Sequence, residues 1–492
     1  MKYISTRGQG PAVTAAGAIR SGIAPDGGLY VPVEFPRWQD LTPLFPLNYG
    51  QRAVRLLADF LTDYSQGELW ECVEGAYGNS FHHPQIAPVR EIQPDLHILE
   101  LWHGPTGAFK DLALQILPHL LTRAVAKTDG EYKTLILVAT SGDTGKAALE
   151  GFRDVANTEI IVFYPAAGVS PMQERQMVTQ EGDNVHVVAV EGNFDDAQRG
   201  VKSLFVDPRF QGELARMNIK TSSANSINWG RLVPQIVYYF SAYCDLVQGG
   251  TLSAGQKVDV VVPTGNFGNI LAAYYAREMG LPINRLICAS NANHVLVQFL
   301  MTGVYDRKRQ FAKTISPSMD ILISSNVERL LFSLTEQDQA QVREWMDQLE
   351  SDGRYDVGQY LEKIRDIFWA HWASDEETMA TIKEVFATTG YLLDPHTAVA
   401  KCVYDKYRQS GGEPYPTIIA STASPFKFNR SVATALLGPQ DEDEFSLLKR
   451  LAEYTQWPIP PFLADLDRKP IRHRTVCRPQ AMGETVVRLL GS

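Results

Sequence analysis

The stretch TLILVATSGDTGKAALEGFRDVANTEIIVFYP, residues 134–165, joins two short apolar segments through a glycine-containing turn and a helix-like segment. Residues 134–140 and 159–165 are largely apolar and rich in β-branched residues, which is typical of buried strands. Between them, residues 146–155 have the pattern of a helix. Apolar strands that alternate with helices predict a parallel sheet with helices on both faces, so this stretch predicts an α/β fold.

The same alternation continues on both sides of this stretch. Further strands are predicted at 96–101, 184–190, 257–263, 285–290 and 417–422, and further helices at 111–127, 227–247 and 270–280. We therefore predict an α/β core over residues 96–438, with an irregular N-terminal extension, 1–95, that packs on it. A charged helical insertion is predicted near 327–390, and a C-terminal tail over 439–492.

Composition and charge narrow the functional class. The 492 residues are 45% hydrophobic and 21% charged, as in globular proteins, and the net charge of −10 argues against a nucleic-acid-binding surface. No apolar stretch reaches the ~18 residues that a membrane span needs, and the N-terminus lacks the apolar segment of a secretory signal. Cysteine and histidine spacings predict free thiols and no metal site. These features predict a cytoplasmic protein without nucleic-acid or membrane partners.

The segment HGPTGAFKD, residues 103–111, places a lysine at the start of an apolar helix. Burial lowers the pKa of an ammonium group, so Lys110 in a pocket can be neutral and nucleophilic. Such a lysine can form a Schiff base with a carbonyl cofactor. The alternative is a first-turn lysine whose charged end extends to water, and this motif alone does not decide between the two.

Two glycine-containing segments each lie between a predicted strand and a predicted helix. The first offers hydroxyl and backbone N–H groups at a helix start, which suits a carboxylate or a phosphate. Its residues are Ser141, Gly142, Asp143, Thr144 and Gly145. In the second, VPTGNFGN at 262–269, the glycines allow the backbone to approach a phosphate closely. Both segments could instead be ordinary turns, and neither matches a dinucleotide or Walker motif.

The segment STASPFKF, residues 421–428, follows another predicted strand and adds hydroxyl groups. In an open α/β sheet, the carboxyl ends of the strands face the ligand crevice, where Lys110 and both glycine-containing segments are also expected. A lysine, a phosphate-binding loop and a partner for a ring nitrogen are the groups that pyridoxal phosphate requires. We therefore predict this cofactor, with the hydroxyl of Thr422 as the candidate partner of its ring nitrogen.

Taken together, these motifs resemble those of the threonine synthase family. The resemblance covers nearly the whole chain in the family's order, and its motifs are APDGGLYVP, HGPTGAFKD, ATSGDTG, VSPMQERQM, NVHVVAVEGNFDDAQ, NSINWGR, VPTGNFGN, SPSMDI and LDPHTAV. It implies the tryptophan-synthase-β-like fold, known as fold type II among pyridoxal phosphate enzymes. The N-terminal extension and the helical insertion resemble the long form found in bacteria and fungi.

The resemblance also implies roles for individual residues. Lys110 would form the Schiff base with the cofactor, and Thr422 would face the pyridine nitrogen. The residues that would hold the cofactor, chiefly its phosphate, are Gly265, Asn266, Phe267 and Asn269. The loop 141–145 would receive the α-carboxylate of the substrate. Lys146 and Arg231 are candidates, by position, for the cation that meets the phosphate of the substrate.

The implied activity is the last step of threonine biosynthesis, in which O-phospho-L-homoserine and water give L-threonine and phosphate. The resemblance implies that this lyase works by pyridoxal-phosphate-dependent β,γ-elimination and replacement, with Lys110 as the main acid–base group. The expected partner is therefore a small-molecule substrate, and the expected assembly is a monomer or a homodimer.

Two segments depart from the family pattern. Ser424 and Phe426 replace the histidine and alanine of a segment that usually reads STAHPAKF, and Gly107 stands where leucine is common. The first departure leaves open a phospho-lyase that releases 2-oxobutyrate from the same substrate. A catalytically silent binding protein with the same fold is a further alternative, which the intact Lys110 and the 265–269 loop disfavour.

Overall fold

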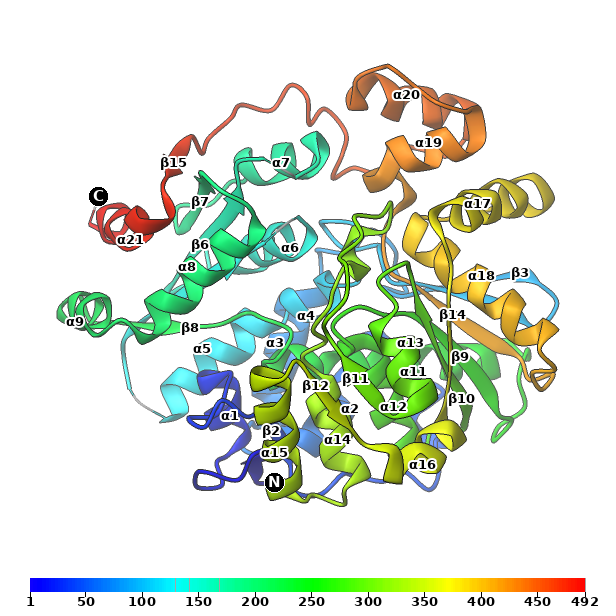
Figure 1. Ribbon diagram of the computed structural model, residues 1–492, viewed down its shortest axis with the longest axis horizontal. Helices are drawn as coiled ribbons and strands as arrows, with labels where there is room; N and C mark the ends of the chain where they lie inside the picture. The colour runs from blue at the N-terminus through cyan, green and yellow to red at the C-terminus, as the bar shows by residue number, and fades with distance from the viewer. Residues whose placement is uncertain (129, 141, 168, 492) are drawn as a thin grey trace.

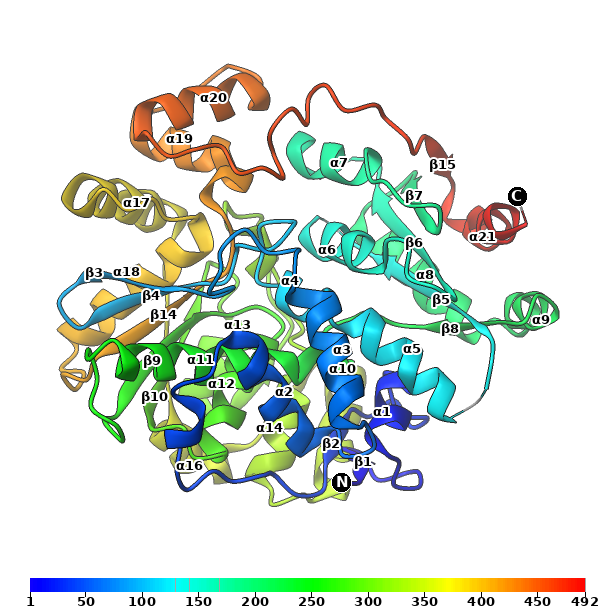
Figure 2. The same cartoon turned by 180° about the vertical axis from the view of Figure 1, so that it is seen from behind.

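The computed structural model describes residues 1–491 except 129, 141 and 168, and two open sheets lie at its centre (Figures 1 and 2). The first sheet has the strand order β13 (Phe368–Trp372), β10 (Ile283–Ser290), β9 (Val258–Pro263), β14 (Thr417–Ser421), β4 (Leu96–Glu100) and β3 (Val89–Gln93). The second has the order β15 (Thr475–Cys477), β7 (Val185–Val190), β6 (Thr158–Pro165), β5 (Lys133–Ala139) and β8 (Ile219–Ser222). Neighbouring strands are parallel except β3 and β4.

Helices cover both faces of each sheet, because successive strand residues point to opposite sides. In β4, Ile98 packs in the cluster that includes α18 (Pro395–Gln409), whereas Leu99 packs in the cluster of α11 (Pro234–Gln248) and α12 (Gly268–Glu278). In β5, Leu137 packs with α8 (Phe194–Val206), and Val138 packs with α6 (Asp143–Phe152). The predicted parallel sheets with helices on both faces are therefore confirmed.

The N-terminal segment packs on the α/β core, where it contacts α11. Its elements are β1 (Tyr3–Ser5), α1 (Ala15–Ser21), β2 (Tyr30–Pro32), α2 (Tyr49–Phe60) and α3 (Gln66–Tyr77). Arg52 of α2 is buried, and its Nη1 donates to Ser241 Oγ at 2.8 Å and pairs with Asp245 Oδ1 at 2.5 Å, both on α11. A buried guanidinium needs such partners, so this contact ties the segment to the core.

Two predicted long helices are each divided in the structure. The segment 111–127 forms α4 (Asp111–Leu114) and α5 (Leu117–Thr128), and the segment 227–247 forms α10 (Trp229–Leu232) and α11. Pro118 and Pro234 lie in the first turn of the second helix of each pair. Proline has no N–H to donate, and in a first turn that loss costs no hydrogen bond within the helix. The prolines therefore set where the second helices begin.

The predicted insertion at 327–390 is mainly helical but also contains strands. Its helices are α14 (Val327–Leu334), α15 (Gln339–Ser351), α16 (Leu361–Ile367) and α17 (Asp375–Thr389). Its strand β12 (Arg354–Asp356) pairs with β11 (Val304–Asp306), and its strand β13 is the edge of the first sheet. The segment therefore completes the core sheet as well as adding helices to it.

The C-terminal segment runs from helices that pack beside α17 to the second sheet. Its helices are α19 (Asn429–Leu437), α20 (Glu444–Thr455) and α21 (Met482–Leu490). The helices α7 (Pro171–Val178), α9 (Pro208–Arg216) and α13 (Val295–Thr302) lie earlier in the chain. After α19 and α20, which pack on one another beside α17, the chain reaches the second sheet (Figure 1). There β15 pairs with β7, and α21 packs against α8 and α9. The division of the chain at residues 95 and 438 stays a prediction.

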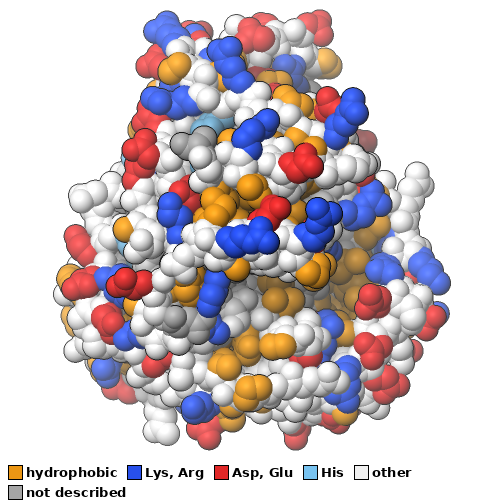
Figure 3. All heavy atoms as spheres, turned by 90° about the vertical axis from the view of Figure 1, so that its left-hand side faces the viewer, with side chains coloured by type: hydrophobic (Ala, Val, Ile, Leu, Met, Phe, Trp, Pro, Cys, Tyr) orange, Lys and Arg blue, Asp and Glu red, His pale blue; other side chains and the backbone are white. Residues whose placement is uncertain are grey.

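Several general expectations can be compared with the structure. The five cysteines are buried and unpaired, so the prediction of free thiols is confirmed. Among the described residues, no helix is long and apolar enough to cross a membrane, and no group of three potential metal ligands occurs. On the face drawn in Figure 3, acidic and basic side chains are interspersed.

Candidate active site

Lys110 immediately precedes α4, after a loop that pairs with the segment following β14. The Phe109 N–H donates to the Thr422 carbonyl at 2.8 Å, and the Ser424 N–H donates to the Gly107 carbonyl at 2.9 Å. These bonds bring Lys110 and Thr422 together at the carboxyl end of β14. Both residues thus lie at the sheet edge where an open α/β sheet binds its ligands.

Gly107 occupies a position where a side chain would be strained and crowded. Its φ is +68°, and a Cβ would lie 2.2 Å from the ring of Phe462 in the C-terminal segment. A larger residue would therefore be strained in its backbone and would displace the phenyl ring. Glycine stands here in place of the family's leucine, and the Phe462 ring packs where a larger side chain would lie, against the loop that precedes Lys110.

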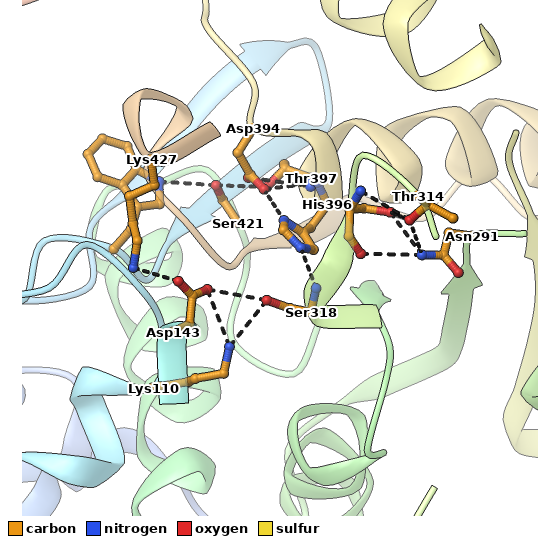
Figure 4. Close-up of polar contacts among 12 residues, drawn as sticks. Lys110, Asp143, Asn291, Thr314, Ser318, Asp394, His396, Thr397, Ser421 and Lys427 are labelled. Carbon is orange, nitrogen blue, oxygen red and sulfur yellow. Dashed lines mark hydrogen bonds and ion pairs between the residues drawn. The ribbon is translucent and has the colours of Figure 1, made fainter. Parts of the chain in front are cut away.

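The amine of Lys110 is largely but not fully buried, with 11% of the side chain exposed, and it faces one carboxylate and one hydroxyl (Figure 4). Its Nζ lies 3.4 Å from Asp143 Oδ2 and 3.4 Å from Ser318 Oγ. Burial lowers the pKa of Lys110, Asp143 opposes that effect, and the positive charges of Lys427 and Arg231 add to it. The ammonium form of Lys110 therefore loses its proton more readily than that of an ordinary lysine.

Asp143, the first residue of α6, contacts two lysines. Lys427 Nζ lies 2.7 Å from Asp143 Oδ1, and the Gln173 Nε2 group donates to the same oxygen at 3.1 Å. Burial raises the pKa of Asp143, but Lys427 and Lys110 lower it by more, so that the pKa lies well below its usual value. The carboxylate is therefore a charged counter-ion, and its charge disfavours direct contact with a substrate carboxylate.

Two N–H groups near the start of α6 already have hydrogen-bond partners within the protein. The Thr140 Oγ1 accepts from the N–H groups of Gly142 and Gly145, both at 3.0 Å. The N–H groups of Asp143 and Thr144 lie in the first turn of α6, where N–H groups have no acceptor within the helix. These two groups are the better candidates for an anion. The predicted contribution of Ser141 lies outside the described residues.

The segment 265–269, called the 265–269 loop, runs from the turn after β9 into the first turn of α12. Phe267 adopts a left-handed φ of +63°, a conformation that is uncommon for a residue with a side chain. A Cβ on Gly265 would lie only 2.7 Å from the Ser318 carbonyl oxygen, so the backbone here has no room for a side chain. The loop leads directly into α12, whose N-terminus favours an anion.

Asn269 supplies a donor that lacks a partner. Its Oδ1 accepts hydrogen bonds from the hydroxyl groups of Tyr238, at 2.8 Å, and Tyr239. Its Nδ2 is buried and has no hydrogen-bond partner within the described part of the chain. A buried donor without a partner is costly, and a phosphate oxygen would satisfy it. The residues of this loop therefore fit the phosphate of pyridoxal phosphate.

His396 fixes the segment that carries Ser318. Its Nε2 accepts the Ser318 N–H at 3.1 Å, and its Nδ1 lies 2.8 Å from Asp394 Oδ1. Because the amide must donate, Nε2 carries no proton and Nδ1–H donates to the carboxylate. Sequence patterns did not single out His396 or Ser318 as site residues. The segments SPSMDI and LDPHTAV were recognised only as family motifs.

The two candidate cations differ in their availability. Lys146 Nζ lies 2.9 Å from Glu150 Oε2 and donates to Gln180 Oε1, so its charge already has a partner. Arg231 Nη1 donates to the Ala224 carbonyl at 2.8 Å, and no carboxylate of the described residues pairs with the guanidinium. Burial lowers the pKa of Arg231 to about 10. Arg231 therefore stays a candidate for binding an anion, whereas Lys146 is already committed.

Comparisons with known proteins agree with this site. Family models match in the order threonine synthase N terminus, residues 2–77, pyridoxal-phosphate dependent enzyme, residues 82–360, and threonine synthase C-terminal, residues 397–486. The threonine synthase of Pseudomonas aeruginosa is 43% identical over 89% of this chain and 91% of its own length. The chain belongs to the threonine synthase family. The resemblance found in the sequence, and the cofactor pyridoxal phosphate that it implies, are confirmed.

Two further proteins are similar to this chain. The crystal structure of pyridoxal-phosphate-bound threonine synthase from Brucella melitensis matches with a TM-score of 0.88 and 38% identity, covering 99% of both chains. Human threonine synthase-like 1 is 44% identical over 90% of this chain. The chain spans only about 60% of the length of that relative.

Proposed function

We propose that the chain converts O-phospho-L-homoserine and water into L-threonine and phosphate, with pyridoxal phosphate held by Lys110 and the loop 265–269. The observation that carries the proposal is the largely buried Lys110 amine, 3.4 Å from both Asp143 Oδ2 and Ser318 Oγ. This amine lies beside a loop that fits a phosphate, at the edge of a parallel sheet. Membership of the threonine synthase family supports the reaction class.

The residues of the site divide the binding of the cofactor among them. When bound, pyridoxal phosphate supplies an electron sink that stabilises negative charge on the substrate carbons. The residues that would bind its phosphate are Gly265, Asn266, Phe267 and Asn269. Thr422 is buried at the end of β14, where its hydroxyl would face the ring nitrogen. A hydroxyl at that position leaves the ring nitrogen uncharged.

Lys110 would hold and move the protons of the reaction. Its amine would take the proton from the α-carbon of the substrate and then one from the β-carbon, and return protons after phosphate has left. Ser318 Oγ and Asp143 Oδ2 hold the amine on one side, which limits the directions in which it can reach.

The substrate would be recognised mainly through its two anionic ends. The N–H groups of Asp143 and Thr144 would receive the α-carboxylate, in place of the full 141–145 loop that the sequence suggested. Arg231 is the candidate for a phosphate group because it is buried without a carboxylate partner in the described residues. We extend the proposal to a monomer or homodimer that works in the cytoplasm.

A second candidate function is release of 2-oxobutyrate, ammonia and phosphate from the same substrate. Ser424 favours it, since its Oγ is buried and has no hydrogen-bond partner among the described residues. The serine that stands in place of the family's histidine therefore makes no side-chain hydrogen bond within the described residues. This departure lies two residues from Thr422, beside the predicted position of the ring nitrogen.

Product analysis with O-phospho-L-homoserine tests the proposed function. The purified chain is incubated with pyridoxal phosphate and the substrate, phosphate release is measured, and the organic product is identified by chromatography and mass spectrometry. We expect one L-threonine for each phosphate, with the hydroxyl oxygen at the β-carbon derived from labelled water. The same chain carrying Lys110→Ala is the matched blank for uncatalysed phosphate loss.

Other products would assign a different function to the chain. Phosphate with 2-oxobutyrate and ammonia would replace the synthase by a phospho-lyase and would direct attention to Ser424. Restoring the family's residue with Ser424→His would then be expected to raise the share of L-threonine. Neither phosphate nor organic product above the blank would overturn both and would leave a binding protein.

A further inference from the structure

Lys110 and Lys427 share a single carboxylate inside the protein. Lys427 lies in the short 3-10 helix Pro425–Phe428 after β14, and its side chain has an exposed fraction of 0%. Its Nζ lies 2.7 Å from Asp143 Oδ1, while Lys110 Nζ lies 3.4 Å from Asp143 Oδ2 (Figure 4). Two ammonium groups thus face one carboxylate, and the closer one is not the lysine expected to react.

The two oxygens of Asp143 have separate sets of partners. Oδ1 takes Lys427 and the Gln173 Nε2 group at 3.1 Å, whereas Oδ2 takes Lys110 and the Ser318 hydroxyl at 3.2 Å. Because Lys427 holds the more tightly paired oxygen, much of the negative charge of the carboxylate is already compensated. Lys110 therefore faces a weakened counter-ion, and its own contact is correspondingly long.

The burial of Lys427 decides how it can act. A side chain with no exposed surface cannot reach a ligand in the crevice without a rearrangement of the residues that cover it. Burying an ammonium group is also expensive, and replacing a buried ion pair by apolar residues often does not reduce stability. Lys427 is therefore better explained by its effect on Asp143 than by ligand binding or by stability.

We propose that Lys427 is a positioning residue: by holding Asp143, it keeps that carboxylate from trapping Lys110 in a tight ion pair, so that the amine can release its proton and react. The inference rests on the proposed function, in which Lys110 must lose and regain a proton. The charged groups that act on Lys110 are Asp143, Lys427 and Arg231. The nearby His396 accepts the Ser318 N–H and donates to Asp394.

Removing Lys427 tests the inference through the proton affinity of Lys110. In Lys427→Met, Asp143 keeps only Lys110 as a cationic partner, so the ammonium form of Lys110 becomes more stable. We expect the pH midpoint for acetylation of Lys110 to rise by about one unit, with reactivity below the midpoint falling about tenfold. The full-length protein is labelled with acetic anhydride over a pH series before and after loading with pyridoxal phosphate, and Lys110 is read by peptide mass spectrometry.

Turnover gives a second readout in the same variant. The acidic limb of the pH profile of kcat should move to higher pH by a similar amount, because the free amine of Lys110 forms only at a higher pH. Lys427→Arg keeps a cation beside Asp143 and should restore the position of that limb. A loss of packing alone would lower kcat at every pH and leave the midpoint unchanged.

A matched control is available elsewhere in the chain. Lys401 of α18 is also buried, and its Nζ lies 2.7 Å from Asp405 Oδ2. Lys401→Met removes a buried ammonium group from an ion pair of the same length without touching the site. We expect the Lys110 midpoint to stay at its wild-type value in this variant.

A second pair of variants shows whether the effect passes through Asp143. Asp143→Asn should lower the Lys110 midpoint, and adding Lys427→Met in that background should shift it far less than in the wild type. An equal shift in both backgrounds, or a folded Lys427→Met protein with an unchanged midpoint, would overturn the inference. If Lys427→Met does not fold, an unchanged midpoint in Asp143→Asn overturns it instead. Neither result alters the product assay, so failure of the proposed function is recognised separately.

Discussion

Lys110→Ala is expected to reduce phosphate release from O-phospho-L-homoserine by at least about 10³-fold. The substitution removes both the covalent attachment of the cofactor and the group that moves protons, and each contributes on this scale. The visible absorbance of bound pyridoxal phosphate should also be lost or shifted to that of the free aldehyde. Phosphate release and absorbance spectra of the purified variant check the two effects.

The control for this variant is a second lysine with a different environment. Lys146 lies three residues after Asp143, and its ammonium group pairs with Glu150 at 2.9 Å. Lys146→Ala should keep the absorbance spectrum of the bound cofactor, whatever it does to stability. Turnover of Lys110→Ala within tenfold of the wild type would mean that another amine performs the chemistry.

Gly265→Ala is expected to weaken the binding of pyridoxal phosphate by about 10- to 100-fold. The added Cβ would lie 2.7 Å from the Ser318 carbonyl oxygen, so that either the loop or the Ser318 segment must move. Overpacking of this kind costs about 1–3 kcal/mol, and each 1.4 kcal/mol is tenfold in affinity. The dissociation constant is measured by titrating the apoprotein with the cofactor and following absorbance or fluorescence.

The matched control for Gly265 is a glycine with free space around it. Gly212 lies in α9, and outside its own helix no atom of the described residues comes within 4 Å of the place that a Cβ would take. Gly212→Ala should therefore leave cofactor affinity unchanged. Equal affinities for the wild type and Gly265→Ala would show that the cofactor phosphate does not depend on this loop. The crowding at Ser318 would then be only a packing feature.

The alternation of apolar strands and helices carried enough information to predict the α/β class and the parallel strands, whereas the particular fold type was implied by the family resemblance. Neighbouring residues such as Ile98 and Leu99 are both apolar, and they pack into different clusters on opposite faces of the sheet. Such runs are diagnostic of parallel strands buried on both sides. The interruptions of helices at Pro118 and Pro234 were not predicted, although proline at a first helical turn is a readable signal.

The candidate site was only partly predictable, because its remaining members come from distant parts of the chain. Ser318 lies 208 residues after Lys110, and no local pattern indicates that its hydroxyl would meet the amine. Lys427 stands in the segment 421–428, whose sequence draws attention to its hydroxyl groups and to its departures from the family pattern, not to its lysine. The left-handed turn falls at Phe267 rather than at a glycine, so residue type did not reveal it.

The sequence also did not show that some N–H groups of the 141–145 loop are already hydrogen-bonded within the protein. A turn such as 141–145 indicates an anion site only if its N–H groups are free, and Thr140 takes two of them. Side-chain hydrogen bonds of this kind compete locally with ligands. They depend on rotamers that sequence does not report.

The central claim, that Lys110 is the residue that holds pyridoxal phosphate, is tested most directly by chemical reduction. The loaded protein is treated with sodium borohydride, digested, and searched by peptide mass spectrometry for the reduced cofactor on lysine. The account predicts one adduct per chain, on the peptide that contains Lys110. An adduct on Lys427 or any other lysine in its place, or a loaded protein with none, would contradict it.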